Sequence, residues 1–103
     1  MIIFKREVVF YLDDLIFELY EKDYFTYIES AELFVDKLVD FINQNILLFP
    51  AKKTPLKINY LGAKYIFYKS TKRTTWYIFF EQKEDNFLIT NIKNNNSKKA
   101  KWL

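Results

Sequence analysis

Three short runs rich in isoleucine, tyrosine, phenylalanine and tryptophan follow one another closely in the second half of the chain. Between Lys64 and Lys93 the sequence reads KYIFYKS, TWYIFFEQ and NFLITNIK, separated by the charged segments TKRT and KED. Short runs of this composition, bounded by polar residues, are typical of β-strands. Connections this short join strands that lie side by side, so the segment predicts an antiparallel three-stranded meander.

The predicted meander is apolar on both faces. Side chains alternate along a strand, so Trp76, Ile78 and Phe80 point one way and Tyr77 and Phe79 point the other. In the last strand, Phe87 and Ile89 are expected on one face and Leu88 and Ile92 on the other. Since one layer of helices covers only one face, we expect a partner or the C-terminal tail to cover the second face.

The first residues predict a short strand followed by a helix. Met1–Phe4 (MIIF) is apolar and too short to stand alone, so it is expected to pair with the meander. Apolar residues then recur at the spacing of one helix face, which predicts a helix from about Arg6 to Lys22. These residues are Val8, Tyr11, Leu12, Leu15 and Leu19.

A second helix is expected after a break at Asp23–Phe25. Thr26 and Glu29 have the spacing of a capping box, and Ser30 is an alternative helix start. The helix would continue to about Leu47 and would lie antiparallel to the first helix, because the break between them is short. Pro50 then ends the helical region, since proline has no backbone N–H to donate.

The remaining segments complete an α+β domain. Leu56–Tyr60 is expected to form an edge strand that Pro55 begins, and Gly62 to allow a tight bend. Asn94–Leu103 is either a frayed, flexible tail or a short helix. The predicted architecture is a single domain over residues 1–103, in the order β-α-α-β-β-β, with the helical hairpin packed on a small antiparallel sheet.

Cysteine and histidine are both absent from the sequence. The chain therefore has no disulfide framework, no serine- or cysteine-based triad with a histidine base, and no Cys or His ligand for zinc. The acids of the two predicted helices are spaced as solvated faces, so we predict no metal site and no cofactor. No apolar run is long enough for a membrane span, which favours a cytoplasmic protein without a membrane partner.

Charge is distributed unevenly along the chain. Residues 1–50 carry ten acidic and four basic side chains, whereas residues 51–103 carry twelve basic and three acidic ones. The basic half is also the aromatic meander, a combination that suits phosphate contact and base stacking on single-stranded RNA. The alternative is that lysines only protect the strand edges against aggregation.

The candidate site residues follow from this combination. Arg73, Lys69 and Lys93 are candidates for stabilising charge on a phosphate during RNA cleavage, and Arg73 can grip phosphate with two hydrogen bonds. Glu81, Tyr68 and Tyr77 are the weaker candidates for a general base. The predicted nucleic-acid-binding residues are Lys52, Lys53, Lys57, Lys64, Lys72, Trp76, Tyr77 and Asn95.

From Ile2 to about Asn95 the order of elements resembles the RelE/ParE superfamily of toxins from bacterial type II toxin–antitoxin systems. The segment LGAKYIFYKSTKRTTWYIFFEQKEDNFLITNI carries most of the resemblance, together with Phe49-Pro50 at the end of the second predicted helix. The resemblance implies a plasmid-stabilising toxin that acts on RNA at the ribosome or on DNA gyrase. It also implies a cognate antitoxin and a toxin–antitoxin hetero-oligomer, in which the antitoxin covers the open face.

The chain departs from the RNA-cutting members of that superfamily. The strand that usually opens with an arginine begins Thr75-Trp76-Tyr77, and the usual histidine position falls near Asn94-Asn95. Lys69, Arg73 and Lys93 are the candidates to replace the missing arginine and histidine. Ribosome-dependent endoribonuclease activity is therefore one of the functions that the sequence allows. The alternatives are a non-catalytic module that binds nucleic acid or protein, and an inactive relative of the toxins.

Overall fold

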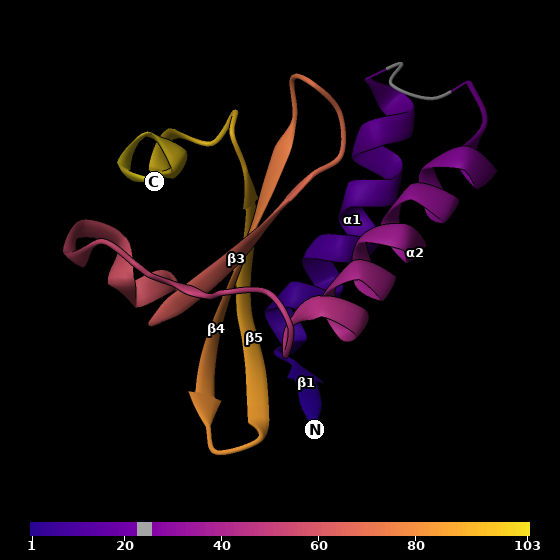
Figure 1. Cartoon of the computed structure of the whole chain (residues 1–103). Helices are drawn as coiled ribbons and strands as arrows, with labels where there is room; N and C mark the ends of the chain where they lie inside the picture. Colours follow the sequence, from indigo (N-terminus) through magenta and orange to yellow (C-terminus); the bar gives the residue numbers. More distant parts are fainter. Residues whose placement is uncertain (23–25) are drawn as a thin grey trace.

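The computed structural model describes residues 1–22 and 26–103 and has an α+β fold. Two helices cover one face of an open five-stranded sheet, and two short 3₁₀ helices lie on the other face (Figure 1). The expected break at Asp23–Phe25 lies outside the described residues.

The sheet is mixed. Its strand order is β1-β5-β4-β3-β2, and the central meander predicted from the aromatic runs is confirmed. The expectation of a wholly antiparallel sheet is wrong at one edge, because β1 runs parallel to β5. The strands are β1 (Ile2–Phe4), β2 (Lys52–Lys53), β3 (Lys64–Lys69), β4 (Thr75–Lys83) and β5 (Asn86–Asn94).

The predicted helical hairpin is confirmed, with one correction at the start of its second helix. Helix α1 spans Arg6–Glu21 and helix α2 spans Ile28–Asn45, and the two lie side by side in opposite directions (Figure 1). The N-cap of α2 is Tyr27, without a side-chain hydrogen bond to the helix. Neither the capping box at Thr26 nor the start at Ser30 is therefore formed, and packing of the apolar face sets the helix start instead.

The main core lies between the helices and the sheet. Val8, Leu12 and Leu15 of α1 are buried, as the helical spacing predicted. They pack with α2 and with one face of the meander, where Ile78 and Ile89 are 0% exposed. Burying each such aliphatic side chain contributes roughly 1.5–3 kcal/mol, so this layer holds the sheet and the hairpin together.

The second face of the sheet is covered by the chain itself. The 3₁₀ helix η1 (Leu56–Leu61) places Ile58 and Leu61 against Tyr65 and Phe79, and the terminal Leu103 packs beside them. Leu56–Tyr60 is therefore not an edge strand. The backbone of η1 is kinked at Ile58, whose φ is −127° and ψ 17°, and both Ile58 and Leu61 are buried in this second apolar cluster.

The C-terminal residues form a second 3₁₀ helix, η2 (Lys98–Trp102), which contacts η1 and β5. Of the two expectations for the tail, the short helix is the one that the structure shows. Together with η1 it covers part of the second face, which a bound antitoxin was expected to cover, while Phe67 on that face stays 41% exposed.

The alternation predicted for the last strand fails after Ile89. The pairing of β4 with β5 shifts between Phe79 and Phe80, so that Thr90 is an extra residue in β5. Ile89 and Ile92 consequently both face the helices, because a bulge moves later side chains to the opposite face.

Candidate functional site

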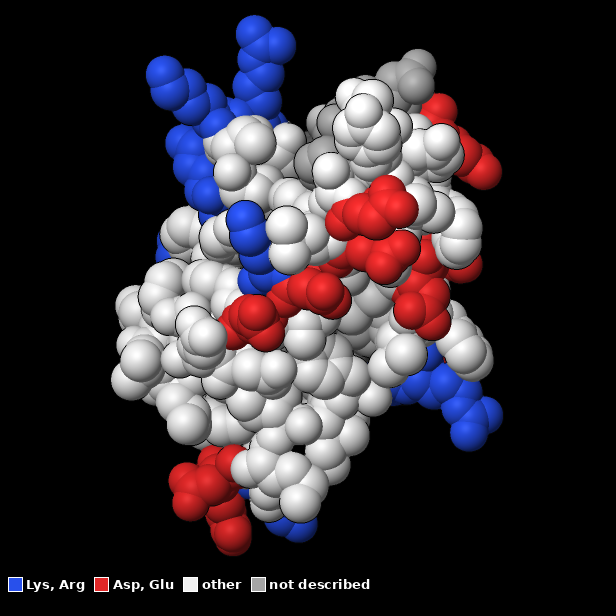
Figure 2. Space-filling model, turned by 90° about the vertical axis from the view of Figure 1, so that its right-hand side faces the viewer, with Lys and Arg blue, Asp and Glu red and all other residues white. Residues whose placement is uncertain are grey.

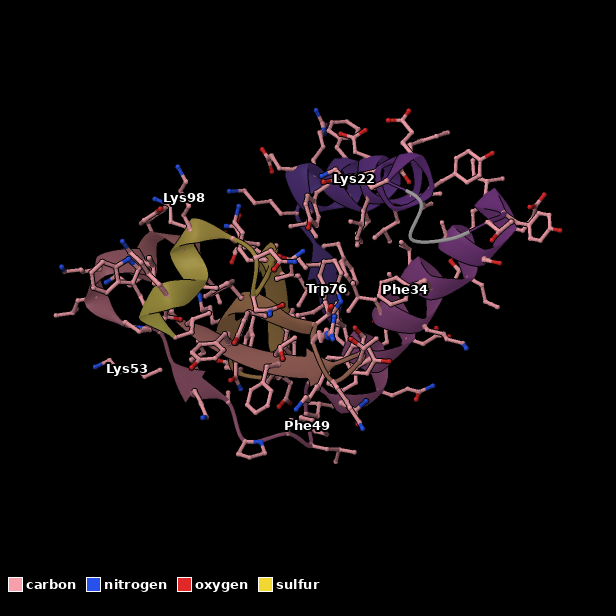
Figure 3. The ribbon with its side chains drawn as sticks, turned by 90° about the horizontal axis from the view of Figure 1, so that it is seen from above. Lys22, Phe34, Phe49, Lys53, Trp76 and Lys98 are labelled. Atoms are coloured by element: carbon pink, nitrogen blue, oxygen red, sulfur yellow. The ribbon has the colours of Figure 1, made fainter. Side chains whose placement is uncertain are left out.

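The structure divides the predicted site residues between the two faces of the sheet. Trp76 was predicted to bind nucleic acid, but it is 2% exposed and packs in the main core against Phe34, at 5.8 Å between ring centroids. Its indole N–H donates to Ser70 Oγ at 3.1 Å. Figure 3 shows Trp76 between the sheet and the helices, so the prediction of an outward-facing stacking surface at Trp76 is wrong.

Tyr77 and Lys93 lie beside each other on the face that carries η1 and η2. Phe67 pairs with Tyr77 in the β3–β4 ladder, and Tyr77 pairs with Lys93 in the β4–β5 ladder. The three side chains therefore form one row across the sheet, and Lys69 lies two residues further along β3. Tyr77 and Lys93 are each half-buried, so part of this row remains accessible.

Lysine side chains lie over exposed aromatic rings on the η1 and η2 layer. Lys57 Nζ is 4.0 Å and Lys101 Nζ 5.0 Å from the ring centroid of Trp102. Lys99 Nζ is 5.6 Å from the ring centroid of Tyr60. These are cation–π distances. We call these five residues the basic aromatic surface: Lys57, Tyr60, Lys99, Lys101 and Trp102.

A further lysine–aromatic pair, outside the basic aromatic surface, lies at the β2 edge of the sheet. Lys52 Nζ lies 5.3 Å from the ring centroid of Phe67, which is 41% exposed. Lys52 pairs with Tyr65 in the β2–β3 ladder, and Tyr65 belongs to the apolar cluster beneath η1. Burial, with a smaller contribution from Tyr77, raises the pKa of Tyr65, so this phenol stays neutral at physiological pH.

Lys53 and Lys64 lie directly opposite each other in the β2–β3 ladder, and both are exposed. Like charges at opposed positions destabilise a strand pair, and an anion bound between them would relieve the repulsion. In Figure 3 the labelled Lys53 and Lys98 lie on the side of the molecule away from Lys22 and Phe34.

The hairpin between β3 and β4 carries Lys72 and Arg73, both exposed. Thr71 Oγ1 accepts the backbone N–H groups of Arg73 at 3.2 Å and Thr74 at 3.0 Å, which fixes the loop. Arg73 therefore lies beyond the end of the sheet, outside the row that contains Lys93. The structure places the three predicted catalytic residues at the same end of the sheet without joining them into one compact cluster.

The helices and the second half of the chain differ in charge. Exposed acids dominate the helical face that is turned toward the viewer in Figure 2, and basic side chains project from its edge and top. Asp13, Asp14, Glu32 and Asp36 are among the exposed helical acids. Neither η1 nor η2 contains Asp or Glu, so an anionic ligand is expected to meet more favourable charge on the η1 and η2 layer than on the helical face.

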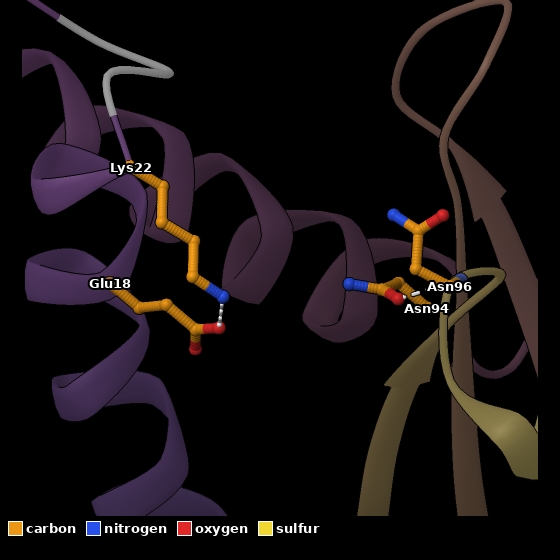
Figure 4. A network of polar contacts seen from close by, with 4 residues as sticks. All are labelled: Glu18, Lys22, Asn94 and Asn96. Atoms are coloured by element: carbon orange, nitrogen blue, oxygen red, sulfur yellow. Dashed lines mark hydrogen bonds and ion pairs between the residues drawn. The ribbon is translucent and has the colours of Figure 1, made fainter.

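A cleft of about 790 Å³ opens on the helical side of the sheet. Tyr11 and Glu18 of α1, with its C-cap residue Lys22, line one wall, and Asn94 and Asn96 line the wall opposite. Figure 4 shows these two walls facing each other, with Lys22 Nζ and Glu18 Oε1 paired at 2.7 Å. Burial, and secondly the negative charge of Glu18, raise the pKa of Tyr11 to about 12, so its hydroxyl is a hydrogen-bond donor and not a base.

The residues considered as a general base have structural contacts. Glu81 accepts the backbone N–H of Ala63 at 2.8 Å. Tyr68 stacks on Phe41 at 4.6 Å between ring centroids, and Tyr77 packs near Tyr65. Across residues 1–22 and 26–103, the structure contains no group of three or more Asp and Glu side chains that could hold a metal ion.

The sequence prediction missed two groups of residues. The predicted nucleic-acid-binding residues left out Tyr60, which was assigned to an edge strand, and also Lys99, Lys101 and Trp102, which belong to the segment expected to be a flexible tail or a short helix. The available signal was Ser97, whose hydroxyl caps η2 by accepting the Lys99 N–H, before the apolar end Trp102-Leu103. The facing cleft residues had no local signal, since α1 and the end of β5 are far apart in the sequence.

Comparisons with protein-family models, with curated proteins and with solved structures found no match for this chain. Within the described part of the chain, neither helix is long and apolar enough to cross a membrane. The structure is an α+β fold in which the two helices cover one face of the sheet and η1 and η2 lie over the other face.

Proposed function

We propose that this chain binds single-stranded RNA through the basic aromatic surface. The observation that carries the proposal is the set of lysine ammonium groups held 4.0–5.6 Å from the rings of Trp102 and Tyr60. Tyr60 is 63% exposed and Trp102 39% exposed, so a base has access to both rings. Unpaired bases stack on such rings while lysines contact the phosphates.

On the basic aromatic surface, lysine–ring contacts can be replaced by base–ring and lysine–phosphate contacts when RNA binds. In the free protein a lysine lies over each ring. The lysine shields part of the ring face from water, and its ammonium group is attracted to the ring. When RNA binds, the base takes the ring and the displaced ammonium group turns to the adjacent phosphate. Both partners remain satisfied, and counterions released from the RNA add a favourable, salt-dependent contribution.

RNA binding of this kind would serve a toxin of a type II toxin–antitoxin pair, acting at the ribosome. The support is the order of β1, the helical hairpin and the meander, which agrees with the order implied by the RelE/ParE resemblance. A cognate antitoxin would form a hetero-oligomer with it. The absence of histidine, and the separation of Arg73 from the row of Lys93, favour binding over RNA cleavage.

Fluorescence polarisation with a labelled single-stranded RNA oligomer tests the binding. The triple variant Lys57→Ala, Lys99→Ala, Lys101→Ala should weaken affinity by about 10-fold or more, since each neutralised phosphate contact contributes. Lys83→Ala is the control, because Lys83 is exposed on β4 at its turn to β5 and lies outside the basic aromatic surface. Equal affinities for the parent protein and the triple variant would refute this site.

Induced expression in bacteria tests the toxin role separately. Growth arrest is the expected result, and Arg73→Ala should weaken it more than Lys83→Ala. Continued growth of cells that contain soluble protein would exclude a toxin while leaving RNA binding intact. Mapping transcript ends after induction would distinguish the targets: new mRNA ends indicate cleavage, whereas damaged DNA without new ends indicates action on gyrase.

A further inference from the structure

The cleft between α1 and the end of β5 combines an apolar floor with directed polar groups. Phe34 and Leu19 are half-buried in its lining, and Trp76 lies beneath them. Asn94 Oδ1 accepts the backbone N–H of Asn96 at 2.9 Å, which fixes the Asn94 amide. In Figure 4 the Asn94 amide nitrogen points across the cleft toward α1. The cleft thus presents a fixed N–H donor above aromatic and aliphatic carbon.

The ligand best matched to these groups is flat and carries hydrogen-bond acceptors on its edge. A nucleobase has both properties, since its ring carbonyls and nitrogens accept N–H groups and its faces pack on apolar side chains. Asparagine amides are among the side chains that pair with base edges. A volume of about 790 Å³ is ample for one nucleoside.

We propose that this cleft is a nucleotide-binding site that holds one nucleobase, with Asn94 and Asn96 contacting the base edge. The inference rests on the proposed RNA binding for its source of ligand, because the same site could take a base of bound RNA or a free mononucleotide. Ser97 lines the cleft and also caps η2, which carries Lys99, Lys101 and Trp102. An RNA strand on the basic aromatic surface can therefore reach the cleft around the end of β5.

The β3–β4 hairpin would place the phosphate of the bound nucleotide. Ser70, Thr71 and Thr74 line the cleft, and Lys72 and Arg73 belong to the same loop. Because both basic side chains are exposed, they can meet a phosphate at the mouth of the cleft. The proposal gives the hairpin a role in binding without any catalytic step.

Tryptophan fluorescence tests the site directly. The sequence has two tryptophans, so Trp102→Phe leaves Trp76, in the cleft lining, as the only reporter. Titration with AMP, GMP, CMP and UMP should give a saturable change in Trp76 emission for at least one of them. Asn96→Phe should weaken that binding by about 10-fold or more, because it fills the cleft from an exposed position.

The matched control is Asn86→Ala, since Asn86 is exposed at the β4–β5 turn, at the opposite end of β5. It should leave nucleotide affinity unchanged, and circular dichroism should show that all variants are folded. In a second arm, a labelled RNA oligomer and the same oligomer with one abasic position are compared. A loss of affinity at the abasic position that is smaller in Asn96→Phe than in the parent identifies RNA as the source of the base in the cleft, because stacking on Trp102 and Tyr60 is the same in both proteins. Saturation by mononucleotides alone identifies a free nucleotide.

Two results would overturn the inference. One is the lack of any saturable Trp76 response together with an equal loss of affinity at the abasic position in the parent and in Asn96→Phe. The other is unchanged nucleotide affinity in Asn96→Phe. Failure of the cleft is distinguishable from failure of the RNA surface, because the basic aromatic surface would still bind RNA and the Lys57, Lys99 and Lys101 triple variant would still weaken that binding.

Discussion

The side chain of Asn95 donates its amide N–H to the backbone carbonyl of Arg73 at 2.8 Å. Asn95 Oδ1 also accepts the backbone N–H of Thr75 at 3.1 Å, and the Asn95 backbone N–H donates to the Thr75 carbonyl at 3.0 Å. Asn95 was predicted to contact nucleic acid, but in the structure it fixes the base of the β3–β4 hairpin. These bonds position the loop that carries Lys72 and Arg73.

Replacing Asn95 with alanine should loosen this hairpin. Two side-chain hydrogen bonds are lost at an exposed position, so we expect about 1–2 kcal/mol of destabilisation and faster exchange of the Thr75 amide hydrogen. Hydrogen exchange measured by NMR checks both. Asn96→Ala is the control because the Asn96 side chain makes neither bond. Unchanged exchange at Thr75 would show that the backbone alone holds the loop.

Gly62 should not tolerate a side chain. Its φ is +155°, and an added Cβ would lie 2.6 Å from Thr90 Oγ1 and 2.8 Å from the backbone nitrogen of Phe80. The backbone of β4 cannot move aside cheaply, so Gly62→Ala should cost about 3 kcal/mol or more. Chemical denaturation measures this loss. Ala63→Gly, at the exposed neighbouring position, is the control, and equal stability of the two variants would contradict the close approach of η1 to the sheet.

Tyr11 should make stability depend on pH under alkaline conditions. Its pKa is raised from 10.0 to about 12 by burial and by Glu18, so the folded state holds the phenol proton more tightly than the unfolded state. The resulting stabilisation, at most about 2–3 kcal/mol, is fully present below pH 10 and is lost as pH rises toward 12. Tyr11→Phe should lack this component of the pH dependence.

Urea denaturation of the parent protein and Tyr11→Phe at pH 8 and pH 11 checks the effect. Lysine deprotonation affects both proteins alike, so the comparison between them isolates the phenol. The parent should lose more stability than the variant on going to pH 11. Parallel losses would mean that the Tyr11 hydroxyl titrates at its ordinary pKa.

The salt dependence of RNA binding should report the number of lysines that contact phosphate. For single-stranded nucleic acid the logarithm of the binding constant falls with the logarithm of salt concentration by roughly 0.7 for each neutralised phosphate. The triple variant at Lys57, Lys99 and Lys101 should therefore have a slope that is shallower by about 2. Polarisation titrations at several salt concentrations measure it, and an unchanged slope would assign the lost affinity to stacking alone.

Much of the fold follows from local patterns in the sequence. The spacing of Val8, Leu12 and Leu15 predicted α1, because the face of a helix is set by residues within a few turns. The aromatic runs predicted β3, β4 and β5 for the same reason, since alternation and short turns are local properties. The order of elements, which underlies the resemblance to the RelE/ParE superfamily, was therefore available from the sequence.

The errors come from positions where distant segments decide the outcome. Leu56–Tyr60 has the composition of a strand, but burial of Ile58 against Tyr65 and Phe79 makes it a 3₁₀ helix. Trp76 is equally suited to stacking on a base and to filling a core, and its contacts with Phe34 and Ser70 place it in the core. Both faces of the sheet are apolar, and sequence periodicity does not show which face packs against α1 and α2 and which against η1 and η2.

The sequence by itself determined the helical hairpin, the meander and the separation of acidic from basic halves, because each depends on neighbouring residues or on composition. Only the tertiary structure decided that η1 and η2 cover the second face, and that Lys57 and Lys101 lie over the ring of Trp102. It also brought Glu18 and Lys22 opposite Asn94 and Asn96. These arrangements require α1, η1 and the C-terminal residues to pack on the same sheet, and the apolar area that this packing buries comes from segments far apart in the sequence.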